Sequence, residues 1–379
     1  NQKPLGKRGL YWLKVHLANS LGVDDIRFDK RVQHTDDNWE QLCRALDNPY
    51  DLHDVFGSDA PLQAYITALE IREAIESGSP ETYESGIAVH MDATVSGTQH
   101  FSAMLRDPIG ALFTNLVDNG TDRKSDLYTH VANEVLKRVA EDSESEYSKF
   151  WLEHGVSRTM AKRPVMTFNY AVTKLTVSDY VRLVYKEETG NDIDNRTAFY
   201  LADKIFEGVA KAIPATYQGM EFLKGCAREV GNDVITWTTP IGFKVYQDRP
   251  NVKRKRLRVK SAGVNVVIAK ETAEGCNKSK MVSSIAPNFI HSYDSAHLSL
   301  TALEMKAKGL QGAYIHDSIG THCCDVDELQ SIVRETFIGM YKDRNVMQEL
   351  KESLGLELEA PKQGDFDLDL VRDSEFFFS

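Results

Sequence analysis

Apolar residues recur at every fourth position in the middle of the chain, the spacing that places them on one face of a helix. The pattern runs over residues 127–139, after Ser125, a residue type common at helix N-caps, and returns over residues 201–213. After Asp325, which can form a capping box with Glu328, another apolar stripe follows. The middle of the chain and the segment after Asp325 are therefore predicted to be helical.

Three shorter segments have the composition of β-strands. Residues 86–92 and 312–322 are short strand-like runs, and residues 256–268 form a longer run with a turn signal at Ala262 and Gly263. The order along the chain is strand, helices, hairpin and strand, without an internal repeat or a long flexible linker. We therefore expect one interleaved α+β fold with a helical majority.

Composition narrows the class of protein. The chain has 379 residues, 42% of them hydrophobic and 27% charged, which is enough apolar material for a large core. Its net charge of −11 excludes binding to nucleic acid through overall charge, so any polyanion needs a local basic patch. The five cysteines form no C-x-x-C pair, which argues against a disulfide scaffold or zinc ribbon and favours a reducing cytoplasm. Neither a signal peptide nor a membrane span is expected.

Two aspartates follow apolar strands that are far apart in the sequence. Asp92 ends the first strand before a turn of small residues, and Asp317 stands between His316 and Ser318 in a second predicted turn. Each suits a metal ligand, because the strand fixes the backbone while the carboxylate reaches solvent. Taken alone, either aspartate is more typical of an ordinary turn. We expect the nearby His100 to be a hydrogen-bonded core residue and not a ligand.

A basic-to-aromatic stripe is predicted on a helix between the two aspartates. Arg158, Lys162, Met166 and Tyr170 stand at four-residue steps and so share one face. The stripe is roughly 18 Å long, about the length of a nucleoside triphosphate, with phosphates at its basic end and the base near Tyr170. Arg163, one residue off the stripe, adds positive charge. An ordinary solvated helix face is equally consistent with the spacing alone.

Together, the two aspartates and this helix are sufficient for nucleotidyl transfer by two metal ions. Carboxylate oxygens are the hard ligands that Mg²⁺ prefers. In such chemistry one ion activates a 3′-hydroxyl, and the other holds the leaving pyrophosphate. The sequence therefore indicates an enzyme that binds nucleoside triphosphates and two Mg²⁺.

Several long segments carry a family resemblance. In chain order they are KPLGKRGLYWLKVHLANSLGVD, DATVSGTQHFSAMLRD, GVSRTMAKRPVMTFNYA, IAPNFIHSYDSAHL, GAYIHDSIGTH and KQGDFDLDLVRDSEFFFS. Over almost its whole length the chain resembles the catalytic half of the single-subunit RNA polymerases of bacteriophages and mitochondria. The resemblance implies a right-hand polymerase, with mostly helical fingers on a palm that contains a small antiparallel sheet. Residues 1–108 would form the first part of the palm, 109–291 the fingers with a basic hairpin near 243–285, and 292–379 the second palm segment and the C-terminal foot.

The resemblance also implies a role for each matching residue. Asp92, the carbonyl of Ala93 and Asp317 would hold two Mg²⁺ in the palm. Arg158 and Lys162 would bind the triphosphate, with Lys162 placed to protonate the leaving pyrophosphate. The nucleotide site would further include Arg163, Met166, Tyr170 and His291, and His316 would face the nucleic acid. One departure is Ala171, where the family usually has glycine; alanine fits a helix well, so the assignment stands.

The nearest alternative is a related DNA polymerase, which shares the two aspartates and the helix stripe. Gly97 replaces a glutamate that packs under the sugar in the DNA enzymes, Met166 replaces an aromatic residue, and Ser318 replaces a glutamate. All three positions resemble the RNA-synthesising family. The second alternative is a catalytically inactive nucleic-acid-binding subunit, which is disfavoured because both aspartates and both basic helix residues are present.

One strongly basic segment contrasts with the acidic composition. Its seven basic residues are Arg249, Lys253, Arg254, Lys255, Arg256, Arg258 and Lys260. The segment lies where the family inserts its promoter-reading hairpin, so nucleic acid is the expected partner. A solvated charged hairpin is the alternative.

The resemblance implies further partners. The substrates would be a DNA template, a nascent RNA and ribonucleoside triphosphates. The first matching segment falls partway into the family's palm, so we expect a second polypeptide, or an upstream part of the same chain, to supply the N-terminal domain, thumb and upstream palm. A split phage polymerase of two subunits fits this expectation. The expected location is the cytoplasm, of an infected bacterial host if the chain is phage-encoded.

Overall fold

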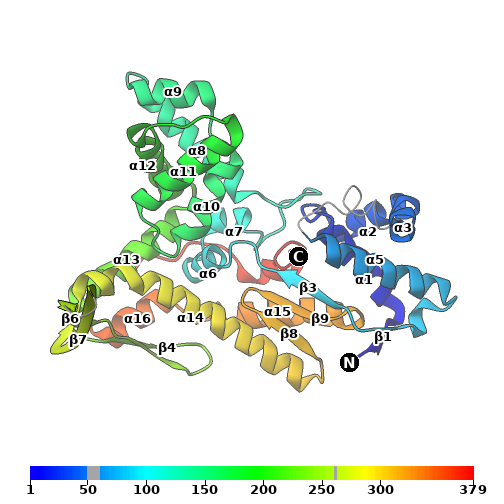
Figure 1. The fold of residues 1–379 in the computed structure, drawn as a ribbon. Coiled ribbons are helices and arrows are strands. Elements are labelled where there is room, and N and C mark those ends of the chain that lie inside the picture. The colour runs from blue at the N-terminus through cyan, green and yellow to red at the C-terminus, as the bar shows by residue number, and fades with distance from the viewer. Residues whose placement is uncertain (49–59, 260–262) are drawn as a thin grey trace.

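The computed structural model describes residues 1–48, 60–259 and 263–379, and most of this chain is helical (Figure 1). The helices are α1 (Gly6–Ser20), α2 (Phe28–Asp37), α3 (Trp39–Asp47), α5 (Pro61–Glu76), α6 (Ser96–Leu105), α7 (Pro108–Phe113), α8 (Leu127–Glu141), α9 (Glu146–His154), α10 (Arg158–Phe168), α11 (Lys174–Thr189), α12 (Asn195–Ala212), α13 (Pro214–Val230), α14 (Lys278–Ala307), α15 (Val326–Tyr341) and α16 (Val346–Leu354). The strands are β1 (Lys3–Pro4), β2 (Glu84–Ser85), β3 (Ala88–Asp92), β4 (Ile235–Thr238), β5 (Lys244–Gln247), β6 (Pro250–Val259), β7 (Val264–Cys276), β8 (Gly312–Ile315) and β9 (Ser318–His322). The expected α+β fold with a helical majority is confirmed. Within the described ranges, no helix is long and apolar enough to cross a membrane.

A three-stranded antiparallel sheet, in the order β3–β9–β8, lies between the N-terminal helices and the stack of helices α8 to α12 (Figure 1). The strand predicted over 86–92 is observed as β3. The segment 312–322 forms two paired strands and not a single one. The chain reverses between Ile315 and Ser318, which pair with each other, so the turn predicted at Asp317 is observed. His316 makes this short turn possible by adopting a left-handed conformation with φ of 48°. The other described strands pair as β1–β2, β4–β5 and β6–β7.

The helices α8 to α12 contain both of the apolar stripes predicted in the middle of the chain (Figure 1). The stripe residues of α8 and α12 are buried. The predicted cap of α8 is wrong by one residue: Asp126, and not Ser125, is the N-cap. Its carboxylate accepts hydrogen bonds from the backbone N–H groups of Tyr128 and Thr129, at 3.0 and 3.3 Å. An aspartate at this position stabilises the free N–H groups of the first helical turn.

The helix predicted after Asp325 is observed as α15, with its apolar stripe buried. The predicted capping box is wrong, because the side chain of Asp325 makes no capping hydrogen bond. Asp325 instead forms an ion pair with Lys3, at 2.7 Å between Oδ2 and Nζ. This contact joins the start of α15 to the N-terminal segment.

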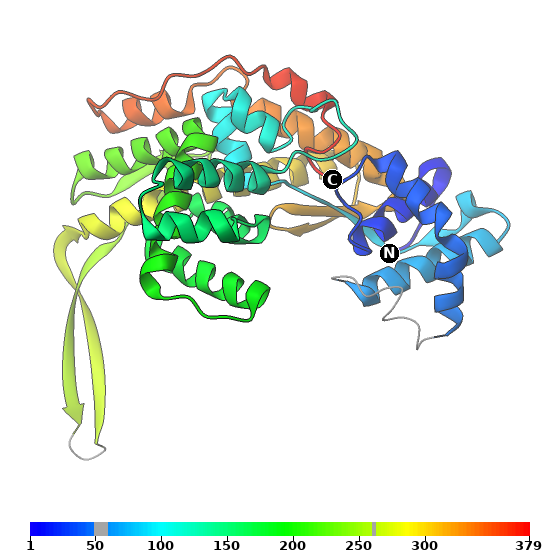
Figure 2. The ribbon, with the colours of Figure 1, turned by 90° about the horizontal axis from the view of Figure 1, so that it is seen from above.

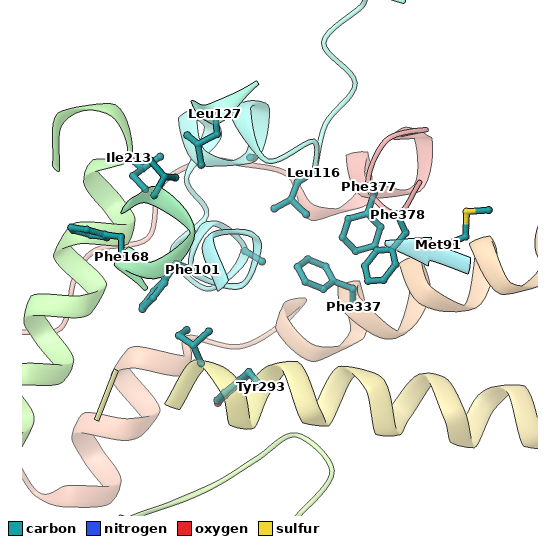
Figure 3. Close-up of a cluster of buried hydrophobic side chains, with 14 of the residues drawn as sticks. Met91, Phe101, Leu116, Leu127, Phe168, Ile213, Tyr293, Phe337, Phe377 and Phe378 are labelled. Atoms are coloured by element: carbon teal, nitrogen blue, oxygen red, sulfur yellow. The ribbon is translucent and has the colours of Figure 1, made fainter. Parts of the chain in front are cut away.

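An aromatic core lies under β3. Phe377 and Phe378, near the end of the chain, pack with Phe337 of α15 and lie beside Met91 of β3 (Figure 3). The backbone N–H of Ser379 donates to the carbonyl oxygen of Asp92 at 3.0 Å. The C-terminal residues therefore support the strand that ends at Asp92.

The strands β6 and β7 form a hairpin that projects away from the body (Figure 2). The hairpin is longer than the predicted run of residues 256–268. Lys260 and Ala262 lie outside the described residues. At the base, the backbone N–H of Cys276 donates to the carbonyl of Asn232, and that of Asn277 to the carbonyl of Arg249, both at 2.7 Å. The long hairpin is thus joined to the body at one end.

Gly208 marks the close packing of α12 on α8. A Cβ at this position would come within 2.6 Å of Val135 Cγ2 and 3.2 Å of the Val135 backbone nitrogen. We expect Gly208→Ala to lower the free energy of unfolding by about 1–3 kcal/mol through overpacking. Gly339 in α15 is the matched control, because no described atom beyond its chain neighbours and its own helix backbone lies within 4 Å of a Cβ there, and Gly339→Ala should raise stability by about 0.5–1 kcal/mol. Urea denaturation measures both changes, and a neutral Gly208→Ala would contradict the packing argument.

Candidate active site

The pairing of β3 with β9 brings the two predicted metal ligands together. Asp92 is opposite Ser318 in the ladder, and the backbone N–H of Ala93 donates to the carbonyl oxygen of Asp317 at 3.1 Å. Both aspartates are exposed. Two carboxylates from distant parts of the sequence therefore stand at one end of the sheet, with the backbone of Ala93 beside them.

A cleft of about 1040 Å³ opens at this end of the sheet. Its lining includes Asp92, Ala93 and Ser318 from the sheet, and Arg158 and Lys162 from α10. Two ion pairs also line it, Arg123–Asp25 and Lys124–Asp24. The cleft thus combines carboxylates with basic side chains, an arrangement that suits a polyphosphate bound together with metal ions.

Arg158 begins α10 and is held by a residue that the sequence analysis did not identify as functional. Its Nε donates to Asp126 Oδ2 at 2.7 Å, and its guanidinium lies 5.1 Å from the centre of the Tyr128 ring. Burial raises the pKa of Asp126, but the hydrogen bond from Thr129 and the charge of Arg158 outweigh it, so the pKa is lowered. Asp126 therefore remains charged and orients Arg158. The position of Asp126 directly before the apolar stripe of residues 127–139 is the sequence signal that could have identified it.

The other residues of α10 lie in different surroundings. Lys162 lines the cleft with Arg158, as their four-residue spacing predicts. The guanidinium of Arg163 lies over the ring of Tyr180 in α11, 5.5 Å from its centre. Met166 is 44% exposed, one turn after Lys162.

The prediction that the helical stripe continues to Tyr170 is wrong. α10 ends at Phe168, so Tyr170 lies in the following turn and does not continue the helical face. Ala171, which would fit a helix, instead has a left-handed backbone with φ of 58°. That conformation favours glycine, so the usual glycine of the family at this position has a backbone explanation.

Tyr170 nevertheless lies with His291. The two rings are stacked, with their centres 4.5 Å apart and their planes at 26°. Burial raises the pKa of Tyr170 to about 12, and the nearby carboxylate of Asp294 contributes. The hydroxyl of Tyr170 is therefore protonated at neutral pH and available as a hydrogen-bond donor.

Asn169 positions this turn and was missed by the sequence analysis. Its buried side chain donates to Thr98 Oγ1 at 2.8 Å. A Cβ on Gly97 would come within 3.0 Å of Asn169 Nδ2, so Gly97 allows α6 to approach the end of α10. The space beside Gly97 is thus occupied by Asn169. No local pattern signals this contact, because Thr98 and Asn169 are 71 positions apart.

A cluster of histidines and carboxylates lies beside the turn at Asp317. His291 and Asp294 stand one turn apart on α14, and His316 meets them from the turn between β8 and β9. His316 Nδ1 is 3.5 Å from Asp317 Oδ1, and the His316 ring is edge-on to that of His291, at 5.7 Å between centres. Burial lowers the pKa of His291, which favours its neutral form.

His100 of α6 contacts this cluster through Asp294. Its Nε2 lies 2.9 Å from Asp294 Oδ1, and its Nδ1 lies 2.5 Å from the hydroxyl of Tyr341. The expectation that His100 is a hydrogen-bonded core residue is confirmed. Burial raises the pKa of Asp294, but the charge and hydrogen bond of His100 outweigh it and lower the pKa. The carboxylate of Asp294 is therefore kept ionised in a buried position.

The predicted nucleic-acid-binding residues are mostly on the hairpin. Arg249 lies at its base, where its Nε is 3.2 Å from Ser284 Oγ. The backbones of the next five basic residues belong to β6: Lys253, Arg254, Lys255, Arg256 and Arg258. Lys260 lies outside the described residues.

Comparisons with known proteins agree with this arrangement. A family model described as DNA-dependent RNA polymerase matches residues 3–359. Over its full length the chain is 40% identical to a DNA-directed RNA polymerase of Pseudomonas phage phiKMV, of which it covers 48%. It is 33% identical to the mitochondrial DNA-directed RNA polymerase 1 of Arabidopsis thaliana, of which it covers 40%. It is also 31% identical to the chloroplastic DNA-directed RNA polymerase 3A of Nicotiana tabacum, covering 40%.

These matches establish the class of protein as a relative of the phage and organelle RNA polymerases. The chain belongs to the DNA-dependent RNA polymerase family, and the resemblance noted in its sequence is confirmed. Members of this family generally use divalent metal ions. The chain spans less than half the length of these curated relatives.

Proposed function

We propose that the chain is the catalytic half of a DNA-directed RNA polymerase. It would add ribonucleoside triphosphates to the 3′ end of a nascent RNA under the direction of a DNA template. The observation that carries the proposal is the pairing of β3 with β9, which places Asp92 next to Asp317 beside a cleft lined by basic residues of α10. No observation on the described residues favours a related DNA polymerase or an inactive subunit.

The residues at the end of the sheet fit two Mg²⁺ ions. Asp92 and Asp317 present exposed carboxylates on adjacent strands, and oxygen is the ligand type that Mg²⁺ requires. Asp92, the carbonyl of Ala93 and Asp317 would hold both ions. When bound, such ions lower the pKa of the attacking 3′-hydroxyl and offset the charge of the pyrophosphate.

The basic residues of α10 would bind the triphosphate. Asp126 accepts from Arg158 Nε, so the terminal nitrogens of the guanidinium are left for the phosphates. Lys162 lies one turn along the same face, where it would bind the phosphates and protonate the leaving pyrophosphate. Arg163 and Met166 would border the nucleotide from the same helix.

Tyr170 and His291 would contact the incoming ribose and base. Their stacked rings lie next to the turn of Asp317, and the protonated hydroxyl of Tyr170 suits a contact with the 2′-hydroxyl. His316, which lies between His291 and Asp317, would face the nucleic acid.

The domain boundaries follow the polymerase interpretation. Residues 1–108 and 292–379 would form the palm around the central sheet, and residues 109–291 the fingers, including α8 to α12 (Figure 1). The boundary between 291 and 292 lies inside α14, so this helix would connect the two parts. The basic hairpin projects from the fingers segment, which suits contact with a nucleic acid (Figure 2).

An exposed apolar groove supports the proposal of a further polypeptide or an upstream part. The groove has a volume of about 520 Å³ and is lined by residues of α5 and the start of β3. Leu62 is 71% exposed and Ile66 is 48% exposed. The N-terminal domain, thumb and upstream palm of a polymerase would cover this groove, either as a separate subunit or as part of the same polypeptide.

A cytoplasmic location is also proposed, in an infected bacterial host if the chain is phage-encoded. The five cysteines are free, which fits a reducing compartment. Fractionation of cells that express the chain tests the location.

Asp92→Asn and Asp317→Asn should each reduce nucleotide incorporation by several orders of magnitude, because each removes a charged ligand of Mg²⁺. The measurement is incorporation of ribonucleotides on a primed template in Mg²⁺, with circular dichroism to confirm folding. Asp179→Asn, an exposed change in α11, is the matched control and should retain activity. Substantial activity in either active-site variant would refute the two-metal assignment.

Tyr170→Phe should increase the use of deoxyribonucleotides. Without the hydroxyl, the contact that distinguishes the 2′-hydroxyl is lost, so discrimination should fall roughly fivefold or more. Competition between a ribonucleotide and its deoxy analogue measures the ratio, with Tyr246→Phe, on an exposed tyrosine, as control. An unchanged ratio would mean that sugar selection resides elsewhere.

Changing Arg254, Lys255 and Arg256 together to glutamine should weaken template binding. If each contacts about one phosphate, the slope of log K against log salt should decrease by roughly 2–3. A salt titration of binding measures the slope. The control is a triple change of exposed lysines elsewhere, at Lys30, Lys149 and Lys306. Equal slopes for the hairpin variant and the unmodified protein would indicate a solvated hairpin without a nucleic-acid contact.

Leu62→Asp with Ile66→Asp should prevent association with the remaining polymerase domains, because the changes place charges in the apolar groove. Size-exclusion chromatography of the chain with and without those domains measures complex formation. Leu175→Asp, at a leucine that is 66% exposed on α11, is the control. Processive RNA synthesis by the chain alone would contradict the need for a partner.

A further inference from the structure

A second group of metal-binding side chains lies next to the carboxylates of the proposed reaction. His291 and Asp294 are three residues apart on one face of α14, and His316 projects from the turn between β8 and β9. One ligand atom from each of the three residues lies within 4.8 Å of the others. In a tetrahedral zinc site the ligand atoms are roughly 3.4 Å apart, so small rotations of the two exposed imidazoles would complete the geometry.

Asp294 shows that the group is prepared for a ligand. Its Oδ1 interacts with His100, whereas its Oδ2 is buried and makes no hydrogen bond of normal geometry with a described residue. The side chain of Ser96 is close enough to contribute to the lowered pKa of this carboxyl. An unsatisfied oxygen on a buried carboxylate is unfavourable, and a cation would relieve the cost. A void of about 10 Å³, near the size of one water molecule, is lined by two of the three residues, Asp294 and His316, together with Asp317; His291 does not line it.

The surroundings also resemble those of metal sites. Ligating carboxylates are commonly held by a second hydrogen-bonding residue, and His100, itself bonded to Tyr341, holds Asp294 in this way. His291 is held by its stacking on Tyr170. Two imidazoles and one carboxylate are a donor set that prefers zinc and its first-row neighbours over Mg²⁺.

We propose that His291, Asp294 and His316 bind one first-row transition-metal ion of the Zn²⁺ type, at a site distinct from the carboxylate pair Asp92 and Asp317. The bound ion would join the turn that carries Asp317 to α14. It would also fix His291 against Tyr170, where the incoming nucleotide is proposed to lie. Zinc would therefore inhibit nucleotide addition; this consequence rests on the proposed function, whereas the binding rests on the geometry alone.

Calorimetric titration of ZnCl₂ into the 379-residue chain, without nucleotide or Mg²⁺, tests the binding. We expect one tight site, weakened by about tenfold or more in His316→Asn, because one of three protein ligands is lost. Asparagine tolerates the left-handed conformation at this position, so the turn should be retained. Asp294→Asn is the second variant and should show the same loss, with circular dichroism as the check on folding.

Two controls separate this site from other sources of zinc binding. His34→Asn removes a histidine on α2, and Asp92→Asn removes a carboxylate of the proposed magnesium site; both should keep the tight zinc site. Unchanged zinc affinity in both His316→Asn and Asp294→Asn would overturn the proposal, as would a loss confined to Asp92→Asn. In nucleotide incorporation assays, the activity of each protein is compared with its own activity without zinc. The zinc concentration that halves this activity should be about tenfold or more higher for His316→Asn than for the unmodified protein, and equal values would refute the inhibitory role. Because binding is measured without nucleotide, an inactive chain would count against the proposed function and not against the metal site.

Discussion

The antiparallel register of β3 on β9 is the constraint on which the candidate site depends. Met91 pairs with Ile319, and both are buried, whereas the next pair along the ladder, Asp92 with Ser318, lies at the exposed end. A slip of one residue would exchange the buried and exposed faces, so burial of the apolar pair fixes the register. The hydrophobic core under the sheet therefore determines the position of two carboxylates above it, Asp92 and Asp317.

A buried polar contact fixes the positions of three helices next to this sheet. His100 of α6 lies between Asp294 of α14 and Tyr341 of α15, so one imidazole connects three helices that are distant in sequence. Burial of an unpaired charge is unfavourable in free energy, so a buried contact of this kind is stable only when each charged group has a partner of suitable geometry. Its geometry consequently holds α14 in a defined position relative to the sheet, and with it the ring of His291.

The sequence predicts those parts of the structure that depend on local pattern. Four-residue periodicity locates α8 and α12, and apolar runs that end in aspartate locate β3 and the turn at Asp317. The turn at Tyr170 was not predictable, because alanine at 171 favours a helix while the fold requires a left-handed backbone there. Likewise, Asn169 acts through a contact with a distant helix, and the proximity of such residues is set by tertiary packing.

The hairpin of β6 and β7 differs from the rest of the molecule in how it is connected. Its ladder hydrogen bonds run between its own two strands, and the backbone contacts at its base involve Asn232 and Arg249. Val264 and Val267 on β7 are 53% and 54% exposed, so these apolar side chains are not buried in a core. Insertions, deletions or exchange of sequence in the hairpin would therefore leave the sheet intact. During evolution, this part of the chain could diversify independently of the carboxylate pair.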